Sequence, residues 1–140
     1  MGRILSIDYG QKRTGLAVTD PMKIIPNGLA TVSTHLLWDY LQEYTAKEPV
    51  ERIIIGKPMQ TNGLPSENLK RVEEFVRRWQ KHRADIPIEY FDERFTSVMA
   101  HRTMLDAGLH KKARQNKALV DEISATIILQ SYMDSIHFNR

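Results

Sequence analysis

The 140-residue chain lacks cysteine, long apolar runs, internal repeats and low-complexity tracts. Without thiols it can form neither disulfides nor thiolate zinc sites, which is typical of proteins of the reducing cytoplasm. No apolar run approaches the ~20 residues of a membrane-spanning helix, and no apolar segment follows a basic N-terminus as in a secretory signal. We therefore expect a cytoplasmic protein without membrane contacts, folded as a single domain over residues 1–140.

Positive charge is in mild excess and is unevenly distributed. A net charge of +3 and a pI near 9.2 favour polyanionic partners. Residues 70–83 hold six Lys or Arg against Glu73 and Glu74, and the stretch between Asp106 and Asp121 holds four Lys or Arg and no acid. Each cluster fits either a nucleic-acid contact or an ordinary solvated surface.

The spacing of apolar residues predicts alternating strands and helices. Residues 53–55, before Gly56, are apolar without alternation, as in a central strand covered on both faces. We expect Ser33 or Thr34 to cap one helix and Ser66 to cap the next, with a turn at residues 26–28. The expected strands are 3–8, 14–19, 29–32, 53–55 and 88–93, and the expected helices lie within 34–48, 66–79, 96–108 and 118–136.

This order of elements predicts an α/β fold. It is a mixed five-stranded sheet, three antiparallel plus two parallel strands, with helices on both faces. Trp38 and Trp79 are expected to anchor the core. The polar loop 57–65 follows a strand, at the end where ligands of open α/β sheets usually bind.

Acidic residues close two of the expected strands. Asp8 ends the first strand and Glu93 ends the last, and these ends would meet if the two strands were parallel neighbours. Asp121 lies in the first turn of the last helix, in line with Ala125 and Ile128, so it can point toward the sheet. Three carboxylates would then converge.

Such a cluster favours a metal site. Crowded carboxylates raise each other's pKa, whereas hard cations such as Mg²⁺ or Mn²⁺ take oxygen ligands. Two such ions about 3.5–4 Å apart can activate water and stabilise the leaving oxygen of a phosphodiester. The pattern therefore predicts a nuclease in which Asp8, Glu93 and Asp121 are catalytic and bind two divalent ions.

Each of these acids also has a purely structural interpretation. Asp8 could form a turn, Glu93 could pair with Arg94, and Asp121 could complement its helix dipole. Glu122 competes with Asp121, because it lies in line with other apolar residues of the same helix, and periodicity does not choose between the two.

Four motifs together resemble the YqgF family of RuvC/RNase H-like proteins over the whole chain. They are Ser6-Ile7-Asp8-Tyr9-Gly10, Ile55-Gly56-Lys57-Pro58, Asp92-Glu93-Arg94-Phe95-Thr96-Ser97 and the segment 120–129. The resemblance implies an RNase H-like fold, a bacterial cytoplasmic setting and a nuclease that processes the 5′ end of pre-16S rRNA. Members were earlier described as Holliday junction resolvases, so branched DNA is the alternative substrate. The resemblance also places the acidic set at Asp8, Glu93 and Asp121.

Basic residues around these motifs are candidate contacts to nucleic acid. Lys57 stands where the family more often has an apolar residue, so it either contacts phosphate or is merely exposed. Arg94 could orient Glu93 or bind a phosphate bidentately. RNA versus DNA, and monomer versus homodimer, stay open. The candidates are Lys12, Arg13, Lys57, Arg94, Lys111, Lys112, Arg114 and Lys117.

Two other functions fit parts of the sequence. Asp8-Tyr9-Gly10, followed by a hairpin at Thr14-Gly15, also looks like the first phosphate loop of the actin and sugar-kinase fold. Those kinases need two such domains facing each other, and 140 residues supply one. Alternatively, the protein is a non-catalytic rRNA-binding factor that docks through its basic stretches, with strongly salt-dependent affinity.

Overall fold

The computed structural model describes residues 2–58, 66–93 and 117–138. The expected helix within 96–108, the loop 59–65 and most of the basic stretch before Lys117 lie outside these residues. The elements, in chain order, are β1 (Arg3–Asp8), β2 (Arg13–Thr19), β3 (Pro26–Ser33), η1 (Thr34–Leu36), α1 (Leu37–Lys47), β4 (Val50–Lys57), α2 (Asn68–His82), β5 (Ile88–Asp92) and α5 (Lys117–Phe138).

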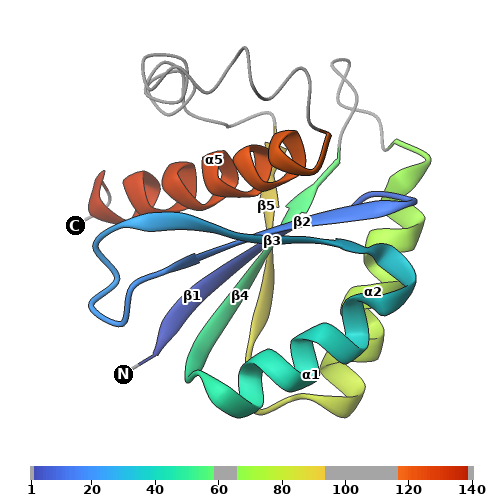
Figure 1. Cartoon of the computed structure of the whole chain (residues 1–140), viewed down its shortest axis with the longest axis horizontal. Coiled ribbons are helices and arrows are strands. Elements are labelled where there is room, and N and C mark those ends of the chain that lie inside the picture. The colour runs from blue at the N-terminus through green and yellow to red at the C-terminus, as the bar shows by residue number, and fades with distance from the viewer. Residues whose placement is uncertain (1, 59–65, 94–116, 139–140) are drawn as a thin grey trace.

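The five strands form one twisted sheet in the order β3-β2-β1-β4-β5 (Figure 1). Pairs β1–β2 and β2–β3 are antiparallel, whereas β1–β4 and β4–β5 are parallel. The predicted mixed sheet is therefore confirmed. The two parallel strands extend it on the side opposite the hairpin strands.

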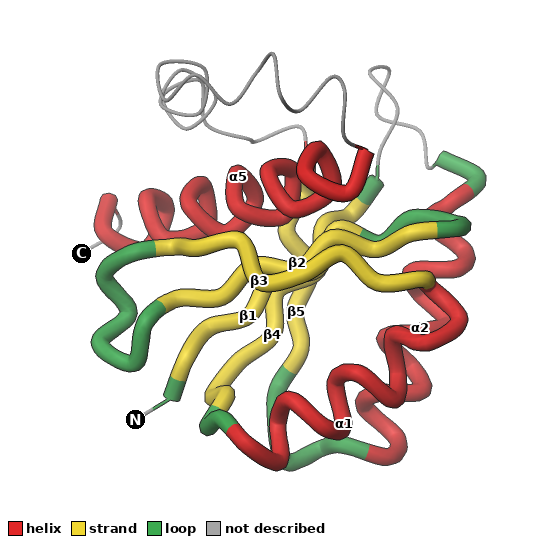
Figure 2. The backbone as a smooth tube through the Cα atoms, in the orientation of Figure 1, coloured by secondary structure: helices red, strands yellow, loops and turns green. Residues whose placement is uncertain are grey.

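Helices cover both faces of the sheet, also as predicted. Helices α1 and α2 pack on one face and α5 lies along the other (Figures 1 and 2). Alternation along β1 divides its side chains between the faces: Leu5 and Ile7 face α1 and α2, whereas Ile4 faces α5. Asp8, four residues after Ile4 on the same strand, therefore also lies on the α5 face.

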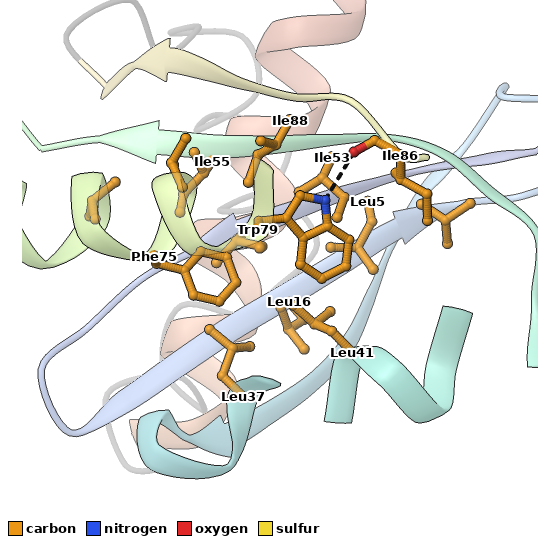
Figure 3. Packing of buried hydrophobic residues seen from close by; sticks show 14 of the residues in the cluster. Leu5, Leu16, Leu37, Leu41, Ile53, Ile55, Phe75, Trp79, Ile86 and Ile88 are labelled. Carbon is orange, nitrogen blue, oxygen red and sulfur yellow. Dashed lines mark hydrogen bonds between the residues drawn. The ribbon is translucent and has the colours of Figure 1, made fainter. Parts of the chain in front are cut away.

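Trp79 forms the centre of the core between the sheet and helices α1 and α2 (Figure 3). Its ring is fully buried, and its indole N–H donates to the Ile86 carbonyl at 2.9 Å. Trp38 is half-buried and packs edge-on against Trp79, with ring centroids 5.6 Å apart. Both tryptophans thus pack with the core, as expected from the sequence.

The turn expected at residues 26–28 is instead the start of β3. Proline is tolerated there because β3 is an edge strand, and a bulge opposite Leu16 and Ala17 accommodates the extra residue. The chain reverses earlier. The carboxylate of Asp20 accepts hydrogen bonds from the amides of Met22, Ile24 and Ile25 at 2.8–3.1 Å.

Both expected helix caps are also wrong. The Ser33 and Thr34 side chains cap no helix, since the Thr34 hydroxyl donates to the Gly10 carbonyl at 2.7 Å. The Ser66 hydroxyl donates to the Pro58 carbonyl at 2.9 Å, and the residue that precedes α2 is Glu67. These hydroxyls hold loops in place rather than ending helices.

No helix in residues 2–58, 66–93 and 117–138 is long and apolar enough to cross a membrane.

Candidate active site

The acidic residues singled out from the sequence lie at one end of the sheet, on the α5 face. Asp8 ends β1, and Glu93 directly follows β5. From the sequence, these two strands were considered as parallel neighbours. In the structure they are not neighbours, because β4 lies between them. A side chain must therefore cross β4 for the two carboxyl groups to meet.

Gly56 on β4 makes this crossing possible. It is buried and pairs with Phe91 on β5, one residue beyond the pairing of Ile55 with Ile7 on β1. A Cβ atom at Gly56 would lie 2.8 Å from Glu93 Oε1, closer than real contacts allow. Because Gly56 has no side chain, the Glu93 carboxyl group can occupy this space.

The carboxyl groups of Asp8 and Glu93 hydrogen-bond each other across this gap. Burial raises the pKa of Glu93 to about 7, with further contributions from the charge of Asp8 and from their hydrogen bond. Burial also raises the pKa of Asp8, to which the charge of Asp121 adds. Two carboxyl groups in such contact retain a shared proton more readily than isolated carboxyl groups do.

Asp121 reaches the same end of the sheet from α5. The helix begins at Lys117, so Asp121 lies in its second turn rather than the first. Its main-chain carbonyl packs directly over Gly15, where an added Cβ would overlap it. Gly15 pairs with Asp8 in the β1–β2 register, so this contact brings Asp121 next to Asp8.

The structure also separates Asp121 from Glu122, which the helical period could not do. Glu122 lies over Gly28 of β3. Burial raises the pKa of Tyr40 on α1, and the charge of Glu122 adds to this increase. It is Asp121 whose charge acts on Asp8. Of the two neighbouring acids, only Asp121 is directed toward the Asp8–Glu93 pair.

Arg13 holds the Asp121 carboxylate. Its Nε donates to Asp121 Oδ2 at 2.8 Å, and the arginine side chain is 44% exposed. Among the residues that the structure describes, no three His, Asp or Glu side chains form a group that could hold a metal ion. The arrangement is therefore a protonated carboxyl pair beside a third carboxylate that is paired with arginine.

Two residues that sequence reasoning missed fix the loop after Asp8. Asn68, at the start of α2, donates from Nδ2 to the Tyr9 carbonyl at 2.7 Å. Thr34 binds the Gly10 carbonyl through its hydroxyl and the Lys12 carbonyl through its amide, at 2.7 and 2.9 Å. Such contacts leave no periodic signal, because they join segments that are remote in sequence.

The candidate nucleic-acid contacts fall into three groups. Lys12 and Arg13 are exposed in the β1–β2 hairpin, beside the acids. Lys57 follows Gly56 and therefore points to the opposite face, where its ammonium lies 5.8 Å from the Tyr90 ring centre. The side chains of Arg94, Lys111, Lys112, Arg114 and Lys117 lie outside the described residues.

The chemistry of the donor set suits a hard divalent cation. Asp8 and Glu93 place carboxylate oxygens side by side in a half-buried position, where a proton now offsets their mutual repulsion. A cation that prefers oxygen ligands could replace that proton. Asp121 would join them with its carboxylate already engaged by Arg13 through Oδ2, so cation binding there would compete with that ion pair.

Comparison with known proteins relates the whole chain to one family. Residues 2–135 match the model of the family described as RuvX: Holliday junction resolvase. A protein of Bacteroides thetaiotaomicron is 64% identical over 138 residues, which are 99% of this chain and 100% of that protein. A protein of Bacteroides fragilis is 65% identical over 135 residues, which are 96% of this chain and 98% of that protein. A protein of Flavobacterium johnsoniae is 58% identical over 138 residues, which are 99% of this chain and 100% of that protein. Each of the three is named "Putative pre-16S rRNA nuclease".

Proposed function

We propose that this chain, which belongs to the RuvX family of Holliday junction resolvases, is a metal-dependent nuclease whose catalytic residues are Asp8, Glu93 and Asp121. The family assignment confirms the resemblance drawn from the motifs, and it favours a nuclease over the phosphotransferase alternative. The match over residues 2–135 also supports a single RNase H-like domain.

The observation that carries this proposal is the hydrogen bond between the Asp8 and Glu93 carboxyl groups. Two half-buried carboxyl groups in contact are unfavourable for folding, because each resists ionisation beside the other. Gly56 leaves the space that the Glu93 carboxyl group fills, and Gly15 lets the backbone of Asp121 approach β2. Perturbed acids assembled in this way are typical of functional sites.

Asp8 and Glu93 would hold the cation, Mg²⁺ or Mn²⁺, with Asp121 completing the ligand set. When bound, divalent ions supply an activated water and stabilise the leaving oxygen of a phosphodiester. The residues of the chain itself have three tasks. Glu93 gives up the shared proton, the Asn68 and Thr34 contacts hold the Asp8 loop rigid, and Lys12 and Arg13 position the phosphate backbone.

The substrate we propose is precursor 16S rRNA, because the similar proteins are named as nucleases of pre-16S rRNA. Cleavage at its 5′ end is what the motif resemblance implies. A role in rRNA processing would place the protein in the cytoplasm. The family description favours a second candidate substrate, the four-way DNA junction. Both substrates present a phosphodiester backbone to the same acids, so only a direct comparison distinguishes them.

The test is to incubate purified protein with Mn²⁺ on matched precursor-rRNA and four-way-junction substrates. We expect cleavage of the rRNA precursor by the wild type, and binding without cleavage by Asp8→Asn. Asp39→Asn, an exposed change on α1, is the matched control and should cleave normally. If wild type binds the precursor but cuts neither substrate, the protein is a non-catalytic rRNA-binding factor. Size-exclusion chromatography of the same samples would decide between monomer and homodimer.

A further inference from the structure

The ion pair between Arg13 and Asp121 joins the start of β2 to α5 beside the proposed catalytic acids. A single N–H of the guanidinium, Nε–H, reaches Asp121. Within the described residues, the other four N–H groups of Arg13 make no further hydrogen bond. The side chain is also 44% exposed, so these donors are available to a ligand from outside.

The pair is not needed to attach α5 to the sheet. Ser6 Oγ donates to the Ala125 carbonyl at 2.6 Å, and Ile128 and Leu129 are buried against the strands. A partly exposed ion pair typically adds less than about 1 kcal/mol to stability. The position of Arg13 therefore has a better explanation in the chemistry of the site than in folding.

We propose that Arg13 is a positioning residue with two successive partners: Asp121 before a divalent cation binds, and a substrate phosphate after the cation has taken Asp121. This inference rests on the proposed function and adds the order of events at that site. The guanidinium holds the third carboxylate in place while the site lacks its cation. If Asp121 held the cation instead, the guanidinium of Arg13 would be free to donate its N–H groups at the edge of the site.

Electrostatic repulsion favours this exchange. A guanidinium and a divalent cation repel each other over a few ångströms, so each weakens the binding of the other to one carboxylate. Once released, the planar donors of arginine match two phosphate oxygens, which a lysine ammonium cannot do as a pair. Metal and nucleic acid thus bind in a coupled way, each favouring the state that the other needs.

The proposal predicts effects of opposite sign on two kinds of binding in Arg13→Gln. Without nucleic acid, Mn²⁺ should bind roughly fivefold more tightly, because a competing positive charge is gone. This is measured by electron paramagnetic resonance of the free ion. In the presence of Ca²⁺, used to limit cleavage, the precursor RNA should bind roughly tenfold more weakly by fluorescence anisotropy, because a charge-assisted contact is lost.

Two further variants keep the test decisive. Lys23→Gln removes one positive charge from a surface ion pair at the opposite end of β2 and should change neither measurement. Arg13→Lys keeps the charge but loses the fork, so we expect wild-type Mn²⁺ affinity with weakened RNA binding. Melting temperatures of all variants check that each is folded.

The outcomes separate this inference from the proposed function. If Asp8→Asn weakens Mn²⁺ binding but Arg13→Gln leaves it unchanged or weaker, the proposed site stands and the exchange by Arg13 is wrong. If Asp8→Asn has no effect on Mn²⁺ binding either, the metal site itself is wrong. Tighter Mn²⁺ binding together with weaker RNA binding in Arg13→Gln supports the exchange.

Discussion

The two faces of the sheet are covered in different ways. Against α1 and α2 lies a continuous apolar core around the fully buried Trp79. Against α5 lies a smaller apolar cluster, including Ile54 and Ile128, which gives way to carboxyl groups at the end of β1 and β5. One face thus holds the main apolar core, whereas the other combines helix packing with carboxyl groups whose burial disfavours folding.

The largest expected effect comes from Glu93→Gln on the α5 face. If this face carries the chemistry, cleavage should fall by about three orders of magnitude, since metal-assisted stabilisation is worth several kcal/mol. The melting temperature at pH 8 without divalent ions should rise, because the amide has no charge to bury. Cleavage kinetics and thermal melts measure both, and Glu43→Gln, an exposed change on α1, is the control. Full activity in Glu93→Gln would contradict the assignment.

Trp79→Ala tests the opposite face. Removing this buried ring, together with its hydrogen bond to Ile86, should lower the free energy of unfolding by about 3–5 kcal/mol. Below the melting temperature, the cleavage rate per folded molecule should stay within about twofold, because the acids lie across the sheet. Chemical denaturation and cleavage assays measure the two quantities. A selective loss of activity in the folded variant would show that the faces are not separate.

Gly56→Ala sharpens the comparison within the α5 face. The added Cβ meets two flexible side-chain ends, Glu93 Oε1 at 2.8 Å and Ile128 Cδ1 at 2.9 Å. We expect Glu93 to be displaced and cleavage to fall roughly ten- to a hundredfold, with a modest loss of stability. Gly15→Ala should lower stability strongly and cleavage less, because there the added Cβ meets the rigid backbone of Asp121 on α5. Equal losses of melting temperature in the two variants would contradict this reasoning.

The smallest effect is the dependence of stability on pH without divalent ions. The pKa of Glu93 rises from 4.5 to about 7 on folding, so between these values the folded protein binds more protons than the unfolded chain. Stability should therefore fall as the pH rises from 4.5 to 7, by about 1 kcal/mol after allowance for solvent screening. Denaturation at several pH values measures this slope. Glu93→Gln should flatten it, and an unchanged slope in that variant would assign the effect to another group.

Much of the fold could be predicted from the sequence because its signals are local. Apolar runs marked β1 and β4, and helical spacing marked α2 with its buried stripe. Pro26 was misleading, because a proline that breaks a central strand is acceptable at an edge. The position of β4 between β1 and β5 was not predictable from spacing, since strand order depends on contacts between remote segments.

The candidate site was predictable in part, for the same reason. Asp8 and Glu93 were visible as acids that close apolar strands. The sequence did not show whether Asp121 or Glu122 faces the sheet. Helix α5 buries residues in line with both acids, so the helical period does not distinguish them. The two glycines gave no signal of their roles, since a missing side chain does not reveal what fills its place.

The most direct test of the central claim is a crystal structure of the protein grown with Mn²⁺, with data collected for anomalous scattering. We predict an anomalous peak bonded to carboxylate oxygens of both Asp8 and Glu93, and its disappearance in Asp8→Asn crystals grown in the same way. A saturating Mn²⁺ concentration that gives no peak between these two residues, while the ion binds elsewhere on the protein, would contradict the assignment of this site.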